Sequence, residues 1–280
     1  MATSQVWFIT GASSGFGEAF ARYALAHGHR VVATARDTDK LAALTATAPE
    51  RVLAYPLDVT REGAAEAAVA AAVERFGHID VLINNAGYGI VGAVEETSAQ
   101  ALRAQMDTNF FGAAAVIRAA LPVLRAQRAG AIVNISSMGG QMSFAGFGAY
   151  SASKFALEGL SEALAAEVAP LGIKVLIVEP GAFRTNLAGA SMQHMPELDA
   201  YRDTVGHTRA FAHAMHDTQA GDPAKAAAAV DQALRADHTP LRLQLGQDAL
   251  DAVREHAEQL LRDLATWTPV GAATAFDGTD

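Results

Sequence analysis

The feature that most constrains this chain is a series of short apolar runs separated by longer helix-forming segments. The runs are almost continuously hydrophobic and lie at residues 6–9, 30–35, 51–57, 81–83, 131–135 and 173–178, with a weaker one at 241–245. Strands that are buried on both faces have this character. The segments between them, such as 17–27, 64–76 and 98–126, are rich in Ala, Leu, Glu and Arg and are long enough for helices.

This repetition predicts an α/β protein with a doubly wound parallel sheet. Right-handed crossovers place helices on both faces of about seven strands, in a Rossmann-like three-layer α/β/α arrangement. A length of 280 residues suits one such domain. We expect a helical substrate lid at about 186–222, where no clear strand is visible, and a mobile tail at about 270–280.

Composition narrows the class of function. A net charge of −9 disfavours binding to nucleic acid or to an anionic membrane surface. The absence of cysteine excludes disulfide scaffolds, thiolate catalysis and Cys-based metal sites. No secretory signal opens the sequence, and no apolar run reaches the roughly 20 residues of a membrane span, so we expect a cytoplasmic protein.

A glycine-rich segment joins the first apolar run to the first helix. Its glycines follow a Gly-x3-Gly-x-Gly pattern, which lets the backbone turn tightly and approach a pyrophosphate at the N-terminus of the helix. Two further loops follow the third and fourth strands, at the sheet edge where open α/β sheets bind ligands. Together they predict a dinucleotide site that includes Gly11, Ser13, Ser14, Gly15, Phe16, Gly17, Asp58, Val59, Asn85, Ala86 and Gly87.

The choice of cofactor depends on two neighbouring residues. The second predicted strand ends at Ala35, which offers no carboxylate to the ribose of NAD. Arg36 comes next and can stack on adenine and pair with a 2′-phosphate, which favours NADP(H) over NAD(H). We expect the following Asp37 to be a loop acid or a helix cap.

A candidate catalytic set lies around the fifth strand. Tyr150 and Lys154 are spaced i, i+4 at the start of a predicted helix, so they share one face. A nearby cation lowers the pKa of a phenol, and we therefore expect Lys154 to prepare Tyr150 for proton transfer near neutral pH. Ser137 follows the fifth strand, where its hydroxyl is available to a substrate carbonyl.

These motifs, in their order and spacing, resemble the classical short-chain dehydrogenase/reductase family over about residues 6–185. The matching positions also include Asn84, Asn109 and the segment Pro180-Gly181-Ala182-Phe183-Arg184-Thr185. The resemblance implies that Tyr150 exchanges a proton with the substrate oxygen, that Lys154 also holds the nicotinamide ribose, and that Ser137 polarises the carbonyl. It further implies a water-holding role for Asn109 and cofactor contacts from Pro180, Gly181, Phe183 and Thr185.

The resemblance also implies a small-molecule alcohol or carbonyl substrate and a homodimer or homotetramer that pairs through helices at 98–126 and 149–169. An apolar substrate pocket predicts a lipophilic or aromatic carbonyl. Its expected residues are Tyr88, Ser137, Met138, Gln141, Phe144, Phe147, Tyr150, Phe183 and Leu187.

The remaining histidines and acidic residues do not indicate a further site, and two alternative functions stay open. His194, His207, His213 and His216 lack a metal-binding pattern, so we expect no metal, and the acidic pair Glu95-Glu96 is interpreted as solvated. Two alternatives to a carbonyl reductase remain: a β-ketoacyl-carrier-protein reductase and a catalytically silent dinucleotide sensor. The intact Ser137, Tyr150 and Lys154 disfavour the sensor, and the acidic charge disfavours docking to an acidic carrier.

Overall fold

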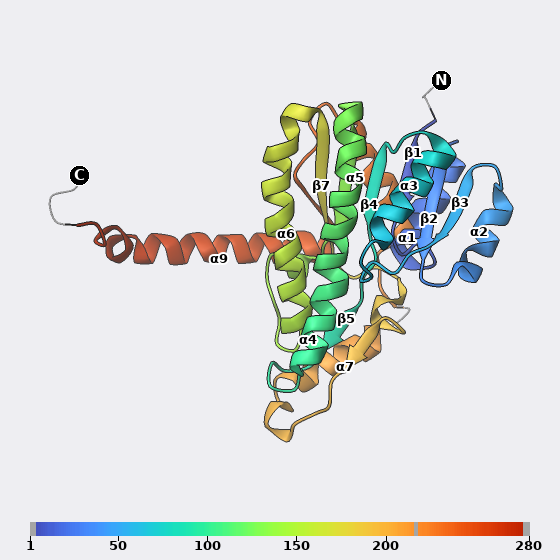
Figure 1. Cartoon of the computed structure of the whole chain (residues 1–280). Coiled ribbons are helices and arrows are strands. Elements are labelled where there is room, and N and C mark those ends of the chain that lie inside the picture. Colours follow the sequence, from blue (N-terminus) through green and yellow to red (C-terminus); the bar gives the residue numbers. More distant parts are fainter. Residues whose placement is uncertain (1–3, 216–217, 277–280) are drawn as a thin grey trace.

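A computed structural model describes residues 4–215 and 218–276, and its centre is one parallel sheet (Figure 1). The spatial order of the strands is β3-β2-β1-β4-β6-β7-β9, and every neighbouring pair is parallel. The order reverses between β1 and β4, which creates the switch point where such sheets bind ligands. The strands are β1 (Val6–Ile9), β2 (Arg30–Ala35), β3 (Val52–Pro56), β4 (Val81–Asn84), β6 (Gly130–Ile135), β7 (Ile173–Pro180) and β9 (Arg242–Leu245).

The central strands are buried on both faces, which confirms the predicted doubly wound three-layer fold. In β1, Trp7 and Ile9 enter one hydrophobic core while Val6 and Phe8 enter the other. Successive side chains of a strand point to opposite faces, so a strand covered on both sides needs apolar residues throughout. The first core packs under α1 (Gly15–Ala26), α2 (Ala42–Thr47) and α8 (Pro223–Arg235), and the second under α3 (Ala64–Phe76), α5 (Ala113–Gln127) and α6 (Gly148–Val168).

The expected helix at 98–126 is interrupted. It divides into α4 (Ala99–Met106), a π-helical turn η2 (Asp107–Gly112) and α5. Residues Ala99–Gln127 are together long and apolar enough to cross a membrane, but Val116, Ile117, Ala120 and Leu124 pack into the core, which accounts for that hydropathy. Short π-helical turns are often found at functional sites, and this one carries Asn109.

Two expectations for the C-terminal third require correction. The segment at 186–222 does contain a strand, β8 (Met192–His194), which pairs with β5 (Gly89–Val91) in a small second sheet. Three residues with a polar end are too few to give a periodic signal. The expected tail at 270–280 begins as helix, because α9 (Gln247–Ala272) continues to Ala272, and residues 277–280 lie outside the described part.

Candidate active site

The glycine loop lies between β1 and α1 with its backbone tightly packed. A side chain at Gly17 would overlap the carbonyl oxygen of Gly11, and Gly11 and Gly15 both have positive φ angles, of 66° and 54°. Ser14 is the N-cap of α1, yet its side chain makes no capping hydrogen bond. The first turn of the helix therefore presents backbone N–H groups that can receive an anion.

The loop after β4 is fastened to the glycine loop by Thr10 and Asn85. The Thr10 hydroxyl accepts hydrogen bonds from the backbone N–H groups of Asn85 and Ala86, at 2.9 and 3.0 Å. The Asn85 side-chain amide donates to the carbonyl oxygens of Thr10 and Gly11, both at 3.0 Å. Two of the loops predicted to line a cofactor thus form one rigid unit, in which Asn85 holds the backbone and Thr10 has a role that the sequence did not reveal.

The residues proposed to select the cofactor lie at the end of β2. Arg36 is exposed, and Asp37 caps the short helix η1 (Thr38–Leu41) by accepting a hydrogen bond from the Asp39 N–H at 3.1 Å. The expectation that Asp37 is a helix cap is confirmed. Asp58 accepts hydrogen bonds from Thr60, which lower the pKa of its carboxyl, and the charge of Arg36 lowers that pKa further.

Ser137 and Tyr150 converge beside Gly139. A methyl group at Gly139 would lie 3.4 Å from the Ser137 hydroxyl oxygen and 3.5 Å from the Tyr150 ring. The Ser137 hydroxyl caps the short helix η3 (Met138–Gly140) by accepting from the Gly139 N–H at 3.0 Å. It also hydrogen-bonds to Tyr150, which lowers the pKa of the phenol, but burial raises that pKa more strongly.

Lys154 lies beside Tyr150, but the Tyr150 pKa is raised rather than lowered as the sequence led us to expect. Its ammonium donates to the Ile135 carbonyl oxygen at 2.8 Å and lies 5.8 Å from the centre of the Tyr150 ring. Burial lowers the pKa of Lys154 itself to about 8, although the nearby Glu158 carboxylate opposes this shift. Desolvation thus outweighs the Ser137 hydrogen bond at Tyr150 and the Glu158 charge at Lys154, and Tyr150 is a neutral phenol at neutral pH.

Asn109 is fully engaged by its surroundings. Its carbonyl oxygen accepts from the Tyr88 N–H at 3.1 Å, and its amide donates to the Tyr88 carbonyl at 3.0 Å and to the Ser153 hydroxyl at 3.1 Å. The prediction that this amide has partners within the apolar helix is confirmed. Ser153, which the sequence did not single out, connects Asn109 to the Tyr150 backbone at 2.6 Å.

A buried carboxylate pair lies one helical turn beyond Lys154. Glu158 and Glu179 share Gln141, whose amide donates to both at 3.2 and 3.1 Å, and Arg242, whose guanidinium is 3.0 and 3.4 Å away. Burial raises the pKa of both carboxyls, that of Glu179 to about 7. The structure therefore places the Gln141 amide on buried carboxylates, whereas the sequence suggested the substrate pocket.

The other expected pocket residues divide into two groups. Tyr88, Met138, Phe147 and Leu187 are half-buried and Phe144 is exposed, and the Phe147 ring lies 6.3 Å from the Tyr150 ring. Phe183 instead packs against Phe16, with ring centres 5.1 Å apart, and closes on the backbone of Gly221. Phe183 thus lies next to the glycine loop.

The segment after β7 is fixed at several points. Pro180 ends β7, the Gly181 N–H donates to the Leu245 carbonyl at 2.9 Å, and the Ala182 N–H donates to Asp248 at 2.6 Å. Thr185 lies over the glycine loop, since a methyl group at Gly15 would be 3.2 Å from its Cβ.

Glu96 anchors the segment that was predicted to be a lid. It is buried, and it pairs at 2.7 Å with Arg209 of α7 (Val205–Met215), which is also buried. Hydrogen bonds from Leu198 and Ala93 help to keep the pKa of Glu96 low despite burial. The interpretation of Glu96 as a solvated residue is therefore wrong, because no local pattern indicates a partner that lies 113 residues away in the chain.

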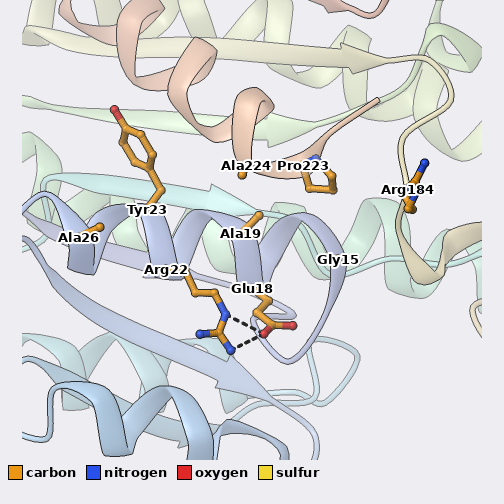
Figure 2. A pocket seen from close by; sticks show the side chains of 9 residues that line it. All are labelled: Gly15, Glu18, Ala19, Arg22, Tyr23, Ala26, Arg184, Pro223 and Ala224. Carbon is orange, nitrogen blue, oxygen red and sulfur yellow. Dashed lines mark hydrogen bonds and ion pairs between the residues drawn. The ribbon is translucent and has the colours of Figure 1, made fainter. Parts of the chain in front are cut away.

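A groove of about 490 Å³ runs along the outside of α1 to α8 (Figure 2). Gly15 and Arg184 lie at one end of it, and the Glu18–Arg22 ion pair extends from the side of α1 that faces away from Pro223 and Ala224. None of the expected substrate residues lines it. The groove therefore borders the glycine loop and is separate from Tyr150.

Metal-binding clusters of three or more His, Asp or Glu side chains do not occur within residues 4–215 and 218–276. The rings of His194 and His213 stack with their centres 4.4 Å apart, and burial lowers the pKa of His194. His216 lies outside the described residues.

The sequence profile of the short chain dehydrogenase family matches residues 5–196. Among curated proteins, oxidoreductase BOA17 of Botryotinia fuckeliana is 40% identical over 97% of this chain and 100% of its own length. The 3-ketodihydrosphingosine reductase of Bacteroides thetaiotaomicron is 46% identical over 65% of each chain.

Solved structures of similar proteins match most of the chain. A short-chain dehydrogenase from Streptomyces avermitilis is 49% identical, with a TM-score of 0.93 over 98% of this chain and 100% of that one. A family member from Burkholderia phymatum, in complex with NAD, is 28% identical with a TM-score of 0.80 over 92% and 95%. An alcohol dehydrogenase from Thermococcus sibiricus, complexed with 5-hydroxy-NADP, is 26% identical with a TM-score of 0.72 over 87% and 96%.

Proposed function

Because the chain belongs to the short-chain dehydrogenase family and is an NAD(P)-dependent oxidoreductase, we propose that it uses NADP(H) to interconvert an alcohol and a ketone or aldehyde. The observation that carries this proposal is the convergence of Ser137 and Tyr150 beside Gly139, with Lys154 one helical turn along. A phenol next to a hydroxyl donor at the carboxyl edge of the sheet suits proton exchange with a carbonyl oxygen.

The residues present fit a dinucleotide. Gly11, Gly15 and Gly17 form a cradle that side chains would fill, and the first turn of α1 has backbone donors for a pyrophosphate. Arg36 supplies a guanidinium for a 2′-phosphate, and the Lys154 ammonium is suited to the nicotinamide ribose. When bound, the nicotinamide supplies or accepts the hydride.

In the direction of reduction, Tyr150 donates its hydroxyl proton to the carbonyl oxygen of the substrate. The phenol is protonated at neutral pH and so carries the proton that a general acid donates, and the Ser137 hydrogen bond offsets part of the rise in its pKa that burial causes. Ser137 donates a hydrogen bond to the same oxygen and stabilises the charge that develops there. In the direction of oxidation, Tyr150 accepts the proton. Asn109 supports this region through Ser153, and we propose that it also holds a water molecule.

A lipophilic or aromatic carbonyl compound is the substrate class that we propose. Tyr88, Met138, Phe147 and Leu187 offer apolar, half-buried surface, and Phe144 is exposed beside them. The segment at 186–222 would cover this surface as a lid. The relative from Bacteroides thetaiotaomicron is named as a 3-ketodihydrosphingosine reductase, which supports a keto compound as the substrate.

We also propose that the protein is a homo-oligomer that pairs through α5 and α6. Phe155 on α6 and Phe111 beside α5 are exposed large apolar residues, which an interface would cover. Sedimentation at micromolar concentration should show a mass above that of the 29.1 kDa chain.

The direct test is oxidation of NADPH and of NADH with a panel of aromatic, steroid-like, retinoid-like and short aliphatic carbonyl compounds, with an acyl-carrier thioester included. We expect turnover with NADPH and the lipophilic compounds. Turnover of the carrier-linked substrate alone would favour the ketoacyl reductase. Binding of NADPH with no turnover of any compound would favour the dinucleotide sensor.

A further inference from the structure

Helix α9 is attached to the rest of the protein only near its start. It has 26 residues, so it is about 39 Å long, and Figure 1 shows it projecting sideways from the sheet and its helices. Ala249 is buried at its base, and Asp248 is fixed by the Ala182 N–H. From residue 257 onward, every described residue of the helix is exposed.

The projecting part nevertheless carries large apolar side chains. Leu260, Leu261, Leu264, Trp267 and Val270 are each 56–66% exposed. A monomeric protein seldom leaves such a contiguous apolar strip in water, so the strip indicates an interaction surface.

The spacing of the strip indicates a helix as its partner. Steps of three and four residues alternate along it, at positions Leu250, Val253, Ala257, Leu260, Leu264, Trp267 and Gly271. This is the heptad repeat by which two helices pack side by side. Leu250 is exposed and Val253 half-buried, so the repeat begins at the base of the helix and continues to its free end.

We propose that α9 pairs antiparallel with α9 of a second copy of this chain. In this arrangement Leu250 packs against the partner's Trp267, and Val253 packs against the partner's Leu264. Ala257 packs against the partner's Leu260 at the centre. The seven positions Leu250, Val253, Ala257, Leu260, Leu264, Trp267 and Gly271 are called the α9 seam below.

Side-chain volume favours the antiparallel direction. Each antiparallel layer combines a smaller residue with a larger one, which fills the space between the helices evenly. A parallel pair would instead place the two Trp267 rings in one layer and the two Ala257 methyl groups in another. That alternation of crowded and empty layers packs poorly.

Charge selects the register. In the proposed register, His256 beside the seam lies near the partner's Asp263, so a carboxylate meets an imidazole. Moving the pairing outward by one heptad would bring Asp263 next to the partner's Asp263, and like charges at such positions are unfavourable. On the other edge of the seam, the same register places Arg254 beside the partner's Leu261, which the alkyl chain of Arg254 then covers.

The absence of cysteine from the chain permits a direct test by disulfide formation. The test mixes equal amounts of two full-length single variants, Leu250→Cys and Trp267→Cys, under mild oxidation and follows the covalent dimer on a non-reducing gel. The two cysteines face each other only between chains, because 17 residues of helix separate these positions by about 26 Å within one chain. We expect a covalent dimer from the mixture and none from either variant alone.

Two controls decide whether the seam brings the cysteines together. Thr266→Cys places the thiol about 100° around the helix from Trp267 and outside the seam, so its mixture with Leu250→Cys should give no dimer. Adding Leu260→Glu and Leu264→Glu to both chains should reduce the covalent dimer at least tenfold. The charge-matched pair Gln259→Glu and Ala265→Glu, off the seam, should leave the yield within twofold.

Three results would overturn the proposal. The first is no covalent dimer from the mixture while circular dichroism shows folded variants. The second is a dimer from Trp267→Cys alone, which indicates a parallel pair. The third is an equal yield from Thr266→Cys, which indicates random collision. Pairing through α5 and α6 does not affect the outcome, because the readout is the contact between the two α9 helices.

Discussion

Removing the buried carboxyl of Glu179 should change how the stability of the protein depends on pH. Glu179 lies on β7, is fully buried, and has a pKa raised to about 7 from its ordinary 4.5 by burial and by the Glu158 charge. The folded state therefore holds a proton that the unfolded state releases between about pH 4.5 and pH 7. Its contribution to folding is most favourable below pH 4.5 and is lost as the pH rises through 7.

The size of the effect follows from that shift. A difference of about 2.5 pKa units at about 1.4 kcal/mol each gives an upper bound of roughly 3.5 kcal/mol. Glu158 interacts with the same carboxyl, and Arg242 offsets part of its charge, so we expect the variant to show a fraction of this upper bound. Glu179→Gln keeps the shape of the side chain and removes the ionisation.

The assay is thermal and urea unfolding of wild type, Glu179→Gln and the control Glu162→Gln between about pH 5 and pH 8. Glu162 contacts the same Arg242 at 2.8 Å but is mostly exposed. We expect the Glu179→Gln stability to rise relative to wild type as the pH increases, by up to about 3.5 kcal/mol. Parallel curves for Glu179→Gln and wild type, or a difference that shrinks with pH, would refute the reasoning.

The remaining predictions concern the cofactor and the proton. Arg36→Ala should weaken NADPH binding by about one to two decades and barely change NADH, whereas Asp37→Ala should spare both, as measured by kcat/KM for each dinucleotide. The rate of carbonyl reduction should fall as the pH rises through about 8, where Lys154 loses its charge. A pH–rate profile that shows no such fall would contradict a role for the charged Lys154 ammonium in the reaction. Gly17→Ala should abolish cofactor binding in a fluorescence titration, because the added methyl overlaps the Gly11 oxygen.

The layers of the fold could be predicted because burial on both faces leaves a strong record in the sequence. A strand such as β1 or β7 must be apolar at nearly every position, and each run could be recognised by itself. The glycine loop was predictable for a similar reason, since Gly17 has no space for a side chain. These constraints are local, so they act on neighbouring residues.

The features that the sequence did not reveal depend on distant partners. Glu96 pairs with Arg209, and Glu158 with Glu179 and Arg242, across long stretches of chain. The residue type alone does not distinguish a buried, paired acid from a solvated one. The raised pKa of Tyr150 likewise depends on burial. The i, i+4 spacing indicates only that the charge of Lys154 is near Tyr150, and it does not indicate how deeply Tyr150 is buried.

The most direct test of the proposed chemistry is Tyr150→Phe, which removes one hydroxyl and keeps the ring. NADPH affinity by fluorescence titration should remain within about threefold of wild type, while the rate of carbonyl reduction falls by about 10²–10⁴-fold, as expected for loss of a general acid. The Ser137→Ala variant should lose rate in the same assay with its NADPH affinity unchanged. If Tyr150→Phe retains more than about a tenth of the wild-type rate, Tyr150 is not the proton donor and the proposed mechanism is wrong.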